Sequence, residues 1–134
     1  MYRTTPKFIV SLQENEVFVF GSNTQGIHGK GAAQMAMMWG AKYGQAEGIQ
    51  GKTYAIPTKN LQTGQILSLE EIQKSISTFV QYTKTALNLI FLVTAVGCGY
   101  AGGKVEDIAP LFKEAFSCFN IYLPFDFIEI LKKA

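Results

Sequence analysis

Two glycine-rich segments contain the residues of this chain that are best suited to bind a ligand. The first, GSNTQGIHGKG, spans residues 21–31, and the second, GCGYAGGK, spans residues 97–104. Glycine adopts positive φ and has no Cβ, so a ligand can approach the backbone and several N–H groups can point into one concavity. A helix that begins just behind such a loop adds free N–H donors. Two loops of this kind that face each other could hold two phosphates, as in a diphosphate.

A purely structural role is the alternative for these loops, because glycine-rich turns between a strand and a helix also occur for steric reasons. The segments match neither the P-loop pattern nor the dinucleotide fingerprint in its required context. A third segment, PTKN at residues 57–60, also follows a short apolar run. Loops that follow parallel strands meet at one edge of a sheet, so we expect the three segments to form one crevice.

Few side chains in these segments could take part in chemistry. Asn23 could hold a ribose hydroxyl or position a water, or it could form an Asx-turn within the loop. His28, the one histidine of the chain, could act as a general base or donate to a phosphate, or be merely exposed. Lys30 and Lys104 could each pair with a phosphate, and Lys59, at the end of a strand, could contact the ligand, whereas solvation is the default for lysine.

Other reactive groups have weaker support. Cys98 precedes an expected helix, and a helix N-terminus lowers the pKa of a thiol, but no His, Asp or Asn partner follows at a recognisable spacing. Steric fit is therefore the favoured role for Cys98. Tyr100 could cover the ligand or serve as a core aromatic. Glu47 could bind a ribose diol or act as a base.

The elements that would position these loops alternate between strands and amphipathic helices. Ser68 and Glu71 form a capping-box pattern at the start of a long helix. Pro110 requires the next helix to begin near Glu106 or Asp107. The expected strands are residues 7–12, 16–20, 53–57, 89–96 and 120–123, and the other expected helices are residues 31–43 and 127–133. This order predicts an α/β fold, a three-layer α/β/α sandwich around a mixed sheet.

Composition limits the class of protein. The 134 residues are 48% hydrophobic and 16% charged, which predicts one globular domain over residues 1–134. The net charge of +2 is too small to indicate nucleic-acid binding, and no apolar run approaches the roughly 20 residues of a membrane helix. Cys98 and Cys118 lack metal-ligand spacing and the chain has one His, so we expect no metal site, and we expect no cofactor. The start of the sequence shows no signal peptide, so we expect reduced thiols and a cytoplasmic location. An excess of lysine over acid between Val17 and Ile66 suits an anionic ligand.

The motifs resemble those of the macrodomain family, whose fold binds ADP-ribose. GSN followed by HGKGAA resembles the family loop that carries an Asn and then runs through glycines into a helix. VGCGYAGGKVEDIAP resembles the phosphate loop, in particular the GCGLD-type loop of the branch that removes terminal ADP-ribose from proteins. YGQAEGIQGKTYAIPTK is similar to a group of short macrodomain-like proteins of bacteria and their phages. The resemblance covers about Val17 to Leu123.

The resemblance implies a role for individual residues. Asn23 would lie near the distal ribose. Apart from the resemblance, we expect Gly21, Ser22, Thr58 and Lys59 to contact the ligand, because they belong to the segments at the strand ends. Gly29, Lys30, Gly31 and Ala32 would line the diphosphate on one side, and Gly97, Cys98, Gly99, Tyr100, Ala101 and Gly102 would close over it from the other. The adenine of the family ligand usually meets an Asp near the first strands, and residues 7–16 contain no such Asp.

Ala101 is the main departure from the family pattern. The terminal ADP-ribose hydrolases carry an Asp at this position, as part of a catalytic pair with a Lys, and alanine cannot transfer a proton. A hydrolytic version of this protein would instead use Asn23 to orient a water, with His28 or Glu47 assisting.

We therefore expect a protein that binds ADP-ribose or a related nucleotide diphosphate through two glycine-rich loops, with hydrolysis of an ADP-ribosyl bond left open. The alternative is a non-catalytic structural or interaction protein, for example an oligomeric component of phage origin, that keeps the fold without the ligand. This alternative predicts a crevice filled by side chains. The sequence also leaves homo-oligomerisation open.

Overall fold

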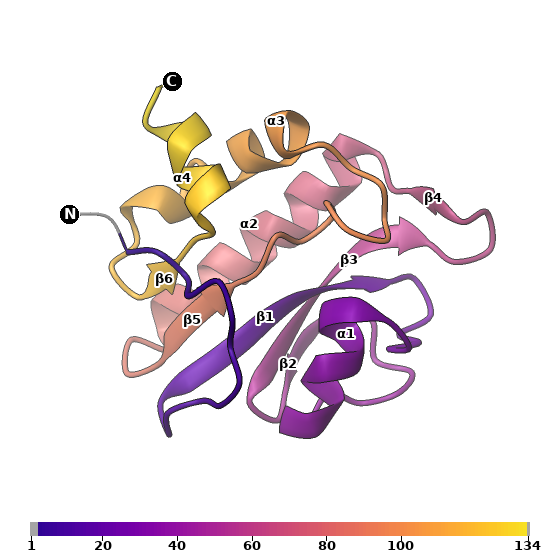
Figure 1. The fold of residues 1–134 in the computed structure, drawn as a ribbon, viewed down its shortest axis with the longest axis horizontal. Helices are drawn as coiled ribbons and strands as arrows, with labels where there is room; N and C mark the ends of the chain where they lie inside the picture. Colours follow the sequence, from indigo (N-terminus) through magenta and orange to yellow (C-terminus); the bar gives the residue numbers. More distant parts are fainter. Residues whose placement is uncertain (1–2, 134) are drawn as a thin grey trace.

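Three apolar strands form the centre of the sheet in a computed structural model that describes residues 3–133. They are β1 (Glu16–Asn23), β3 (Thr53–Asn60) and β5 (Ile90–Val93). β1 pairs in parallel with both β3 and β5 (Figure 1). Most residues of these strands are buried, as expected where helices cover both faces of a parallel sheet.

Shorter strands complete a six-stranded mixed sheet with the order β2-β3-β1-β5-β6. β6 (Ile121–Tyr122) extends the parallel part beside β5. β2 (Gly48–Gln50) and β4 (Gln65–Ile66) both pair antiparallel with β3. The parallel strands thus place three consecutive carboxyl ends, of β3, β1 and β5, along one edge.

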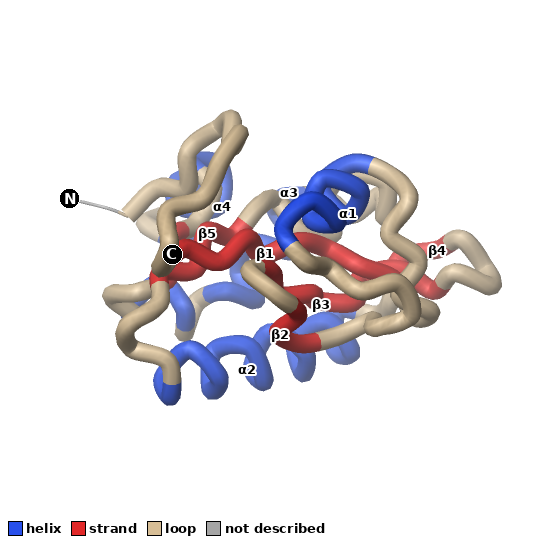
Figure 2. Tube along the Cα trace, turned by 90° about the horizontal axis from the view of Figure 1, so that it is seen from below, coloured by secondary structure: helices blue, strands red, loops and turns tan. Residues whose placement is uncertain are grey.

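Helices cover both faces of the sheet, and Figure 2 shows α1 and α2 on opposite sides of it. The helical elements are α1 (Gly31–Ala36), η1 (Met37–Trp39), α2 (Leu69–Thr85), α3 (Val105–Ile108), η2 (Ala109–Phe112), η3 (Ala115–Ser117) and α4 (Phe125–Leu131). The predicted α/β/α sandwich with a mixed sheet is confirmed.

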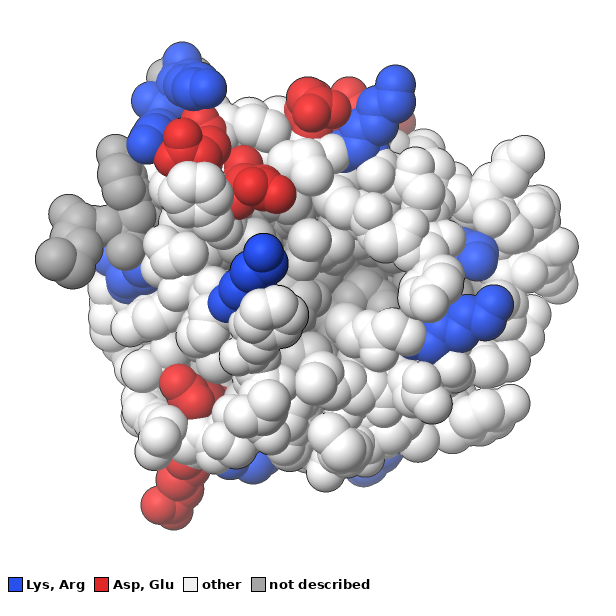
Figure 3. Space-filling model, in the orientation of Figure 1, with Lys and Arg blue, Asp and Glu red and all other residues white. Residues whose placement is uncertain are grey.

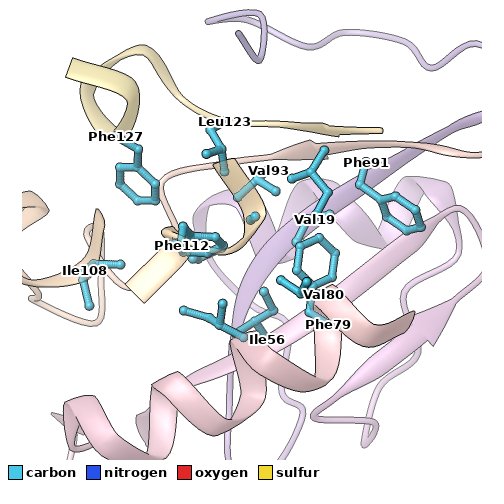
Figure 4. Packing of buried hydrophobic residues seen from close by; sticks show 14 of the residues in the cluster. Val19, Ile56, Phe79, Val80, Phe91, Val93, Ile108, Phe112, Leu123 and Phe127 are labelled. Carbon is cyan, nitrogen blue, oxygen red and sulfur yellow. The ribbon is translucent and has the colours of Figure 1, made fainter. Parts of the chain in front are cut away.

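The larger hydrophobic cluster lies between the sheet and α2, and it continues to η2 and α4 (Figure 4). Phe79 of α2 is fully buried there, with its ring 4.9 Å from that of Tyr54 and 5.6 Å from that of Phe91. A smaller cluster on the other face joins Phe18 and Phe20 of β1 to α1. The alternation of side chains along β1 therefore supplies both layers.

The capping box at α2 is confirmed. Ser68 Oγ accepts a hydrogen bond from the Glu71 N–H at 3.1 Å, and Glu71 Oε1 accepts one from the Ser68 N–H at 3.3 Å. The box satisfies two backbone donors at the helix start and fixes where α2 begins.

Several expected boundaries were wrong, for physical reasons. Residues 7–12 form no strand, because no neighbouring strand pairs with them. The helix expected over residues 31–43 is shorter: the α-helix ends at Ala36 and a 3-10 turn follows at Met37–Trp39. Gly40, with φ +105°, terminates it. The helix after the second glycine loop begins at Val105 and changes to a 3-10 helix at Ala109, where Pro110 lacks the N–H that an α-helix needs.

Other boundaries shifted by a few residues. β2 and β4 lie in segments expected to be loop or connection, and α4 begins at Phe125 rather than Phe127. Within residues 3–133, no helix combines the length and the apolar composition needed to span a membrane.

The core packing of Phe79 gives a test of the fold. Replacing Phe79 with Ala should lower the free energy of unfolding by about 3–5 kcal/mol, because it removes a fully buried ring and leaves a cavity. Urea unfolding followed by circular dichroism measures the change. The matched control is Phe119→Ala, since Phe119 is 61% exposed and its loss should cost no more than about 0.5 kcal/mol. Equal midpoints for the two variants would contradict the described packing.

Candidate functional site

The two glycine-rich loops meet because the strands before them are parallel neighbours. Val19 of β1 lies opposite Val93 of β5, so the loops after both strands leave the same edge. Thr94, the first residue after β5, donates to the Val19 carbonyl through its N–H at 3.1 Å and its Oγ1 at 2.8 Å. These two bonds fix the second loop against β1 at the point where the site begins.

A cavity of about 380 Å³ lies between the loops and the end of β3. All the predicted ligand-binding residues line it except Cys98 and Gly102. The predicted residues that line it are Gly21, Ser22, Asn23, Gly29, Lys30, Gly31, Ala32, Thr58, Lys59, Gly97, Gly99, Tyr100 and Ala101. Ile27, Ala33, Leu61, Thr94, Ala95 and Val96 complete the lining. The three segments therefore border one crevice, as the sequence predicts, although residues 57–60, which were expected to form a loop, are the last residues of β3.

Two glycines are required by the loop geometry. Gly97 has φ +77°, and a Cβ there would come within 3.3 Å of the Ile108 side chain. Gly31 has φ +58°, and a Cβ there would lie 3.0 Å from the Tyr100 ring. Tyr100 of the second loop thus packs against the first loop at a position where only glycine leaves room.

Polar side chains of the first loop are used to hold its shape. Asn23 Nδ2 donates to the Ile27 carbonyl at 2.8 Å, and Asn23 Oδ1 accepts from the N–H groups of Ile27 at 3.1 Å and Gln25 at 3.2 Å. This is the Asx-turn alternative for Asn23. Ser22 Oγ donates to the Ala46 carbonyl, and Thr58 Oγ1 donates to the Ser22 carbonyl at 3.2 Å.

His28 lies away from the cavity. It is 5% exposed and packs edge-on against Phe20, with ring centroids 5.1 Å apart. Neither ring nitrogen has a hydrogen-bond partner within the described part of the chain. The structure therefore brings Asn23 but not His28 to the cavity, and the catalytic pair expected from the sequence is not assembled there.

The charge around the cavity is positive. Lys30 and Lys59 line it, and no Asp or Glu is among its lining residues. Figure 3 shows a hollow near the centre of this face, with basic side chains on both sides and most acidic ones towards the margin. Lys30 Nζ lies 5.6 Å from the centre of the Tyr100 ring, which links the two loops across the opening. Glu47 and Lys104 do not line the cavity.

Cys98 is half-buried and packs against the larger hydrophobic cluster. Burial raises the pKa of its thiol to about 11, and repulsion from Glu106 and Asp126 adds to the effect. A raised pKa keeps the group as the unreactive thiol. The environment of Cys98 therefore favours steric fit over nucleophilic chemistry.

A second cavity of about 680 Å³ adjoins the first and shares Ala32, Thr94 and Ala95 with it. Its other lining residues are Thr5, Pro6, Lys7, Phe8, Ile9, Val10, Phe18, Met35, Val93, Pro124, Phe125 and Asp126. Sequence reasoning missed this region. The strand-end rule could have identified residues 124–126, because they follow β6, which is parallel to β5 and ends at the same edge.

Among residues 3–133, no group of three or more His, Cys, Asp and Glu side chains is placed to hold a metal ion.

No protein-family model matches the chain, and no curated protein matches it. Two solved structures are similar in fold. A protein of unknown function from Bacteroides thetaiotaomicron has 15% identity and a TM-score of 0.59, with 86% of this chain and 90% of that chain covered. Thermosipho africanus DarTG, solved in complex with ADP-ribose, has 18% identity and a TM-score of 0.60.

The fold is macrodomain-like. The alignment with DarTG covers 90% of this chain and 42% of that one, so this chain spans less than half the length of DarTG. At such low identity the similarity shows the arrangement of strands and helices alone.

The second glycine loop supplies a matched pair of substitutions. Gly97→Ala should lower the free energy of unfolding by roughly 1–2 kcal/mol, because it forces a Cβ into a left-handed conformation beside Ile108. Gly99→Ala is the control, since a Cβ at Gly99 would meet nothing within 4 Å. Chemical denaturation of both variants measures the difference. Similar destabilisation by the two alanines would contradict the loop geometry.

Cys98 should react slowly with iodoacetamide in the folded protein. With a pKa of about 11, about one thiol in a thousand is ionised at pH 8, so alkylation should rise roughly tenfold per pH unit from pH 8 to 10. Peptide mass spectrometry separates Cys98 from Cys118. In urea-unfolded protein the rate should instead level off near pH 9. A folded-state rate that already levels off below pH 9 would show that the thiol is not shielded.

Proposed function

We propose that this protein binds ADP-ribose or a closely related nucleotide diphosphate at the carboxyl edge of its sheet. The observation that carries the proposal is the open cavity of about 380 Å³ between the two glycine-rich loops, lined by Lys30 and Lys59 and by no carboxylate. The alternative, a structural protein that keeps the fold without a ligand, predicts a crevice filled by side chains. The open cavity favours ligand binding over that alternative.

Backbone N–H groups would bind the diphosphate. Within the described residues, the N–H groups of Gly99, Tyr100 and Ala101 donate to no protein acceptor, and the same holds for the backbone N–H groups of residues 29–32. Free donors therefore border the cavity from both loops. Successive free N–H groups form a concavity that suits an anion, and Lys59 adds a positive charge. The similarity in fold to DarTG, solved with ADP-ribose, supports this choice of ligand.

The base of the nucleotide would occupy the second cavity, which is continuous with the first through Ala32, Thr94 and Ala95. This cavity is mainly apolar and contains one carboxylate, that of Asp126. A carboxylate is an acceptor for the amino group of a purine. Asp126 would thus accept the hydrogen bond from the base, the role expected of an Asp that residues 7–16 do not contain.

We propose recognition alone, because no carboxylate and no imidazole lines the first cavity. Ala101 lines it at the position where the related hydrolases carry an Asp. The amide of Asn23 is bonded within its own loop, and His28 is buried against Phe20. Lys59 lies beside the end of β1, since its backbone is in register with Asn23.

Calorimetry with ADP-ribose tests the proposal. ADP-ribose should bind in a 1:1 complex, and Lys59→Met should weaken it about tenfold, which is about 1.4 kcal/mol, because one charge-assisted contact to phosphate is lost. Lys42→Met removes the same charge from an exposed lysine that lines neither cavity, and it should leave the affinity unchanged. If ADP-ribose, AMP and cyclic nucleotides all give no heat of binding, the proposal fails and the structural alternative is favoured.

A further inference from the structure

The outer wall of the second cavity is a segment without hydrogen bonds along its backbone. We name residues 6–12 the strap. Before it, the Thr5 N–H donates to the Leu123 carbonyl at 2.8 Å, and after it, Lys52 Nζ donates to the Gln13 carbonyl at 2.7 Å. Between these two points, no hydrogen bond joins the strap backbone to the rest of the described chain. The strap is therefore fixed at both ends and held between them by side-chain packing.

The side chains of the strap divide into two sets. Ile9 and Leu12 pack against the smaller hydrophobic cluster. Phe8 and Val10 point the other way, and each is 81% exposed although both border the second cavity. The folded chain thus leaves a large aromatic ring at the mouth of an apolar cavity, where water solvates it.

A second exposed aromatic ring borders the same cavity from a different element. Phe125, the first residue of α4, is 61% exposed. Its neighbour Asp126 is the carboxylate of the cavity. Two exposed phenyl rings and a carboxylate around a hollow suit a flat heteroaromatic group that carries an amino donor, since such a group has two faces for stacking and an edge for a hydrogen bond.

We propose that the strap is a clamp for the nucleobase, and that Phe8 closes onto the base when the ligand binds. The inference rests on the proposed function, because the diphosphate in the first cavity is what brings the base to the second. Closure requires no backbone hydrogen bond to break, so the movement is of the low-cost local kind. Phe8 then determines specificity: it distinguishes a diphosphate that carries a base from one that does not.

The decisive experiment compares ADP-ribose with inorganic pyrophosphate, which shares the diphosphate and lacks the base. Phe8→Ala should weaken ADP-ribose about tenfold, the usual scale of a lost stacking contact, and leave pyrophosphate binding unchanged. Phe119→Ala is the matched control, because Phe119 is 61% exposed and lines neither cavity. It should change neither affinity. Since Phe8 is itself exposed, both variants should retain the wild-type unfolding midpoint.

Trypsin gives an independent measure of closure, because the Lys7–Phe8 bond lies in the strap. ADP-ribose should slow cleavage of this bond in the wild-type protein, and pyrophosphate should not. Unchanged ADP-ribose affinity in Phe8→Ala, or an equal loss for both ligands, overturns the clamp while leaving the proposed function standing. A shift of Phe8→Ala from dimer to monomer without a change in affinity also overturns it. If the wild-type protein binds neither ligand, the proposed function and the clamp fail together.

Discussion

The parallel pairing of β1 with β3 and β5 is the constraint on which the site depends. It brings three strand ends to one edge, and the two hydrogen bonds from Thr94 to the Val19 carbonyl fix the second loop there. Few side chains join one glycine-rich loop to the other, among them Tyr100, which contacts Lys30 and Gly31. The separation of the loops, and with it the width of the cavity, is therefore set by strand pairing.

Within this frame, the polar groups have separate tasks. The side chains of Ser22, Asn23 and Thr58 are bonded to nearby backbone and stabilise the loops. The N–H groups of residues 29–32 and 99–101 make no such bonds and remain available to an anion. A site in which side chains shape the loops and the backbone faces the cavity is suited to recognition of a diphosphate. No Asp or Glu lines the first cavity, so no carboxylate there can transfer a proton.

The sequence predicted the parts of the structure that are set by local patterns. The apolar runs of the central strands, the Ser68 capping box and the glycine loops were all found, and the loops meet as expected. Features that depend on a partner far away in the chain were not predictable in this way. Residues 7–12 contain an apolar run typical of a strand but have no strand beside them. Asp126 reaches the second cavity through the position of β6. The burial of His28 depends on the path of the first loop, which brings its ring back against Phe20 of β1.

The bonds between Thr94 and Val19 also bear on how the chain acquires its shape. The two residues are 75 positions apart, so the cavity depends on a contact of high sequence separation. Closing so long a stretch of chain is entropically costly and slows folding. No hairpin or helix that forms early can contain both loops, and during synthesis on the ribosome the crevice cannot exist until β5 has emerged. When the denatured chain refolds, the crevice therefore reforms only once β5 has paired with β1, and not during an early collapse.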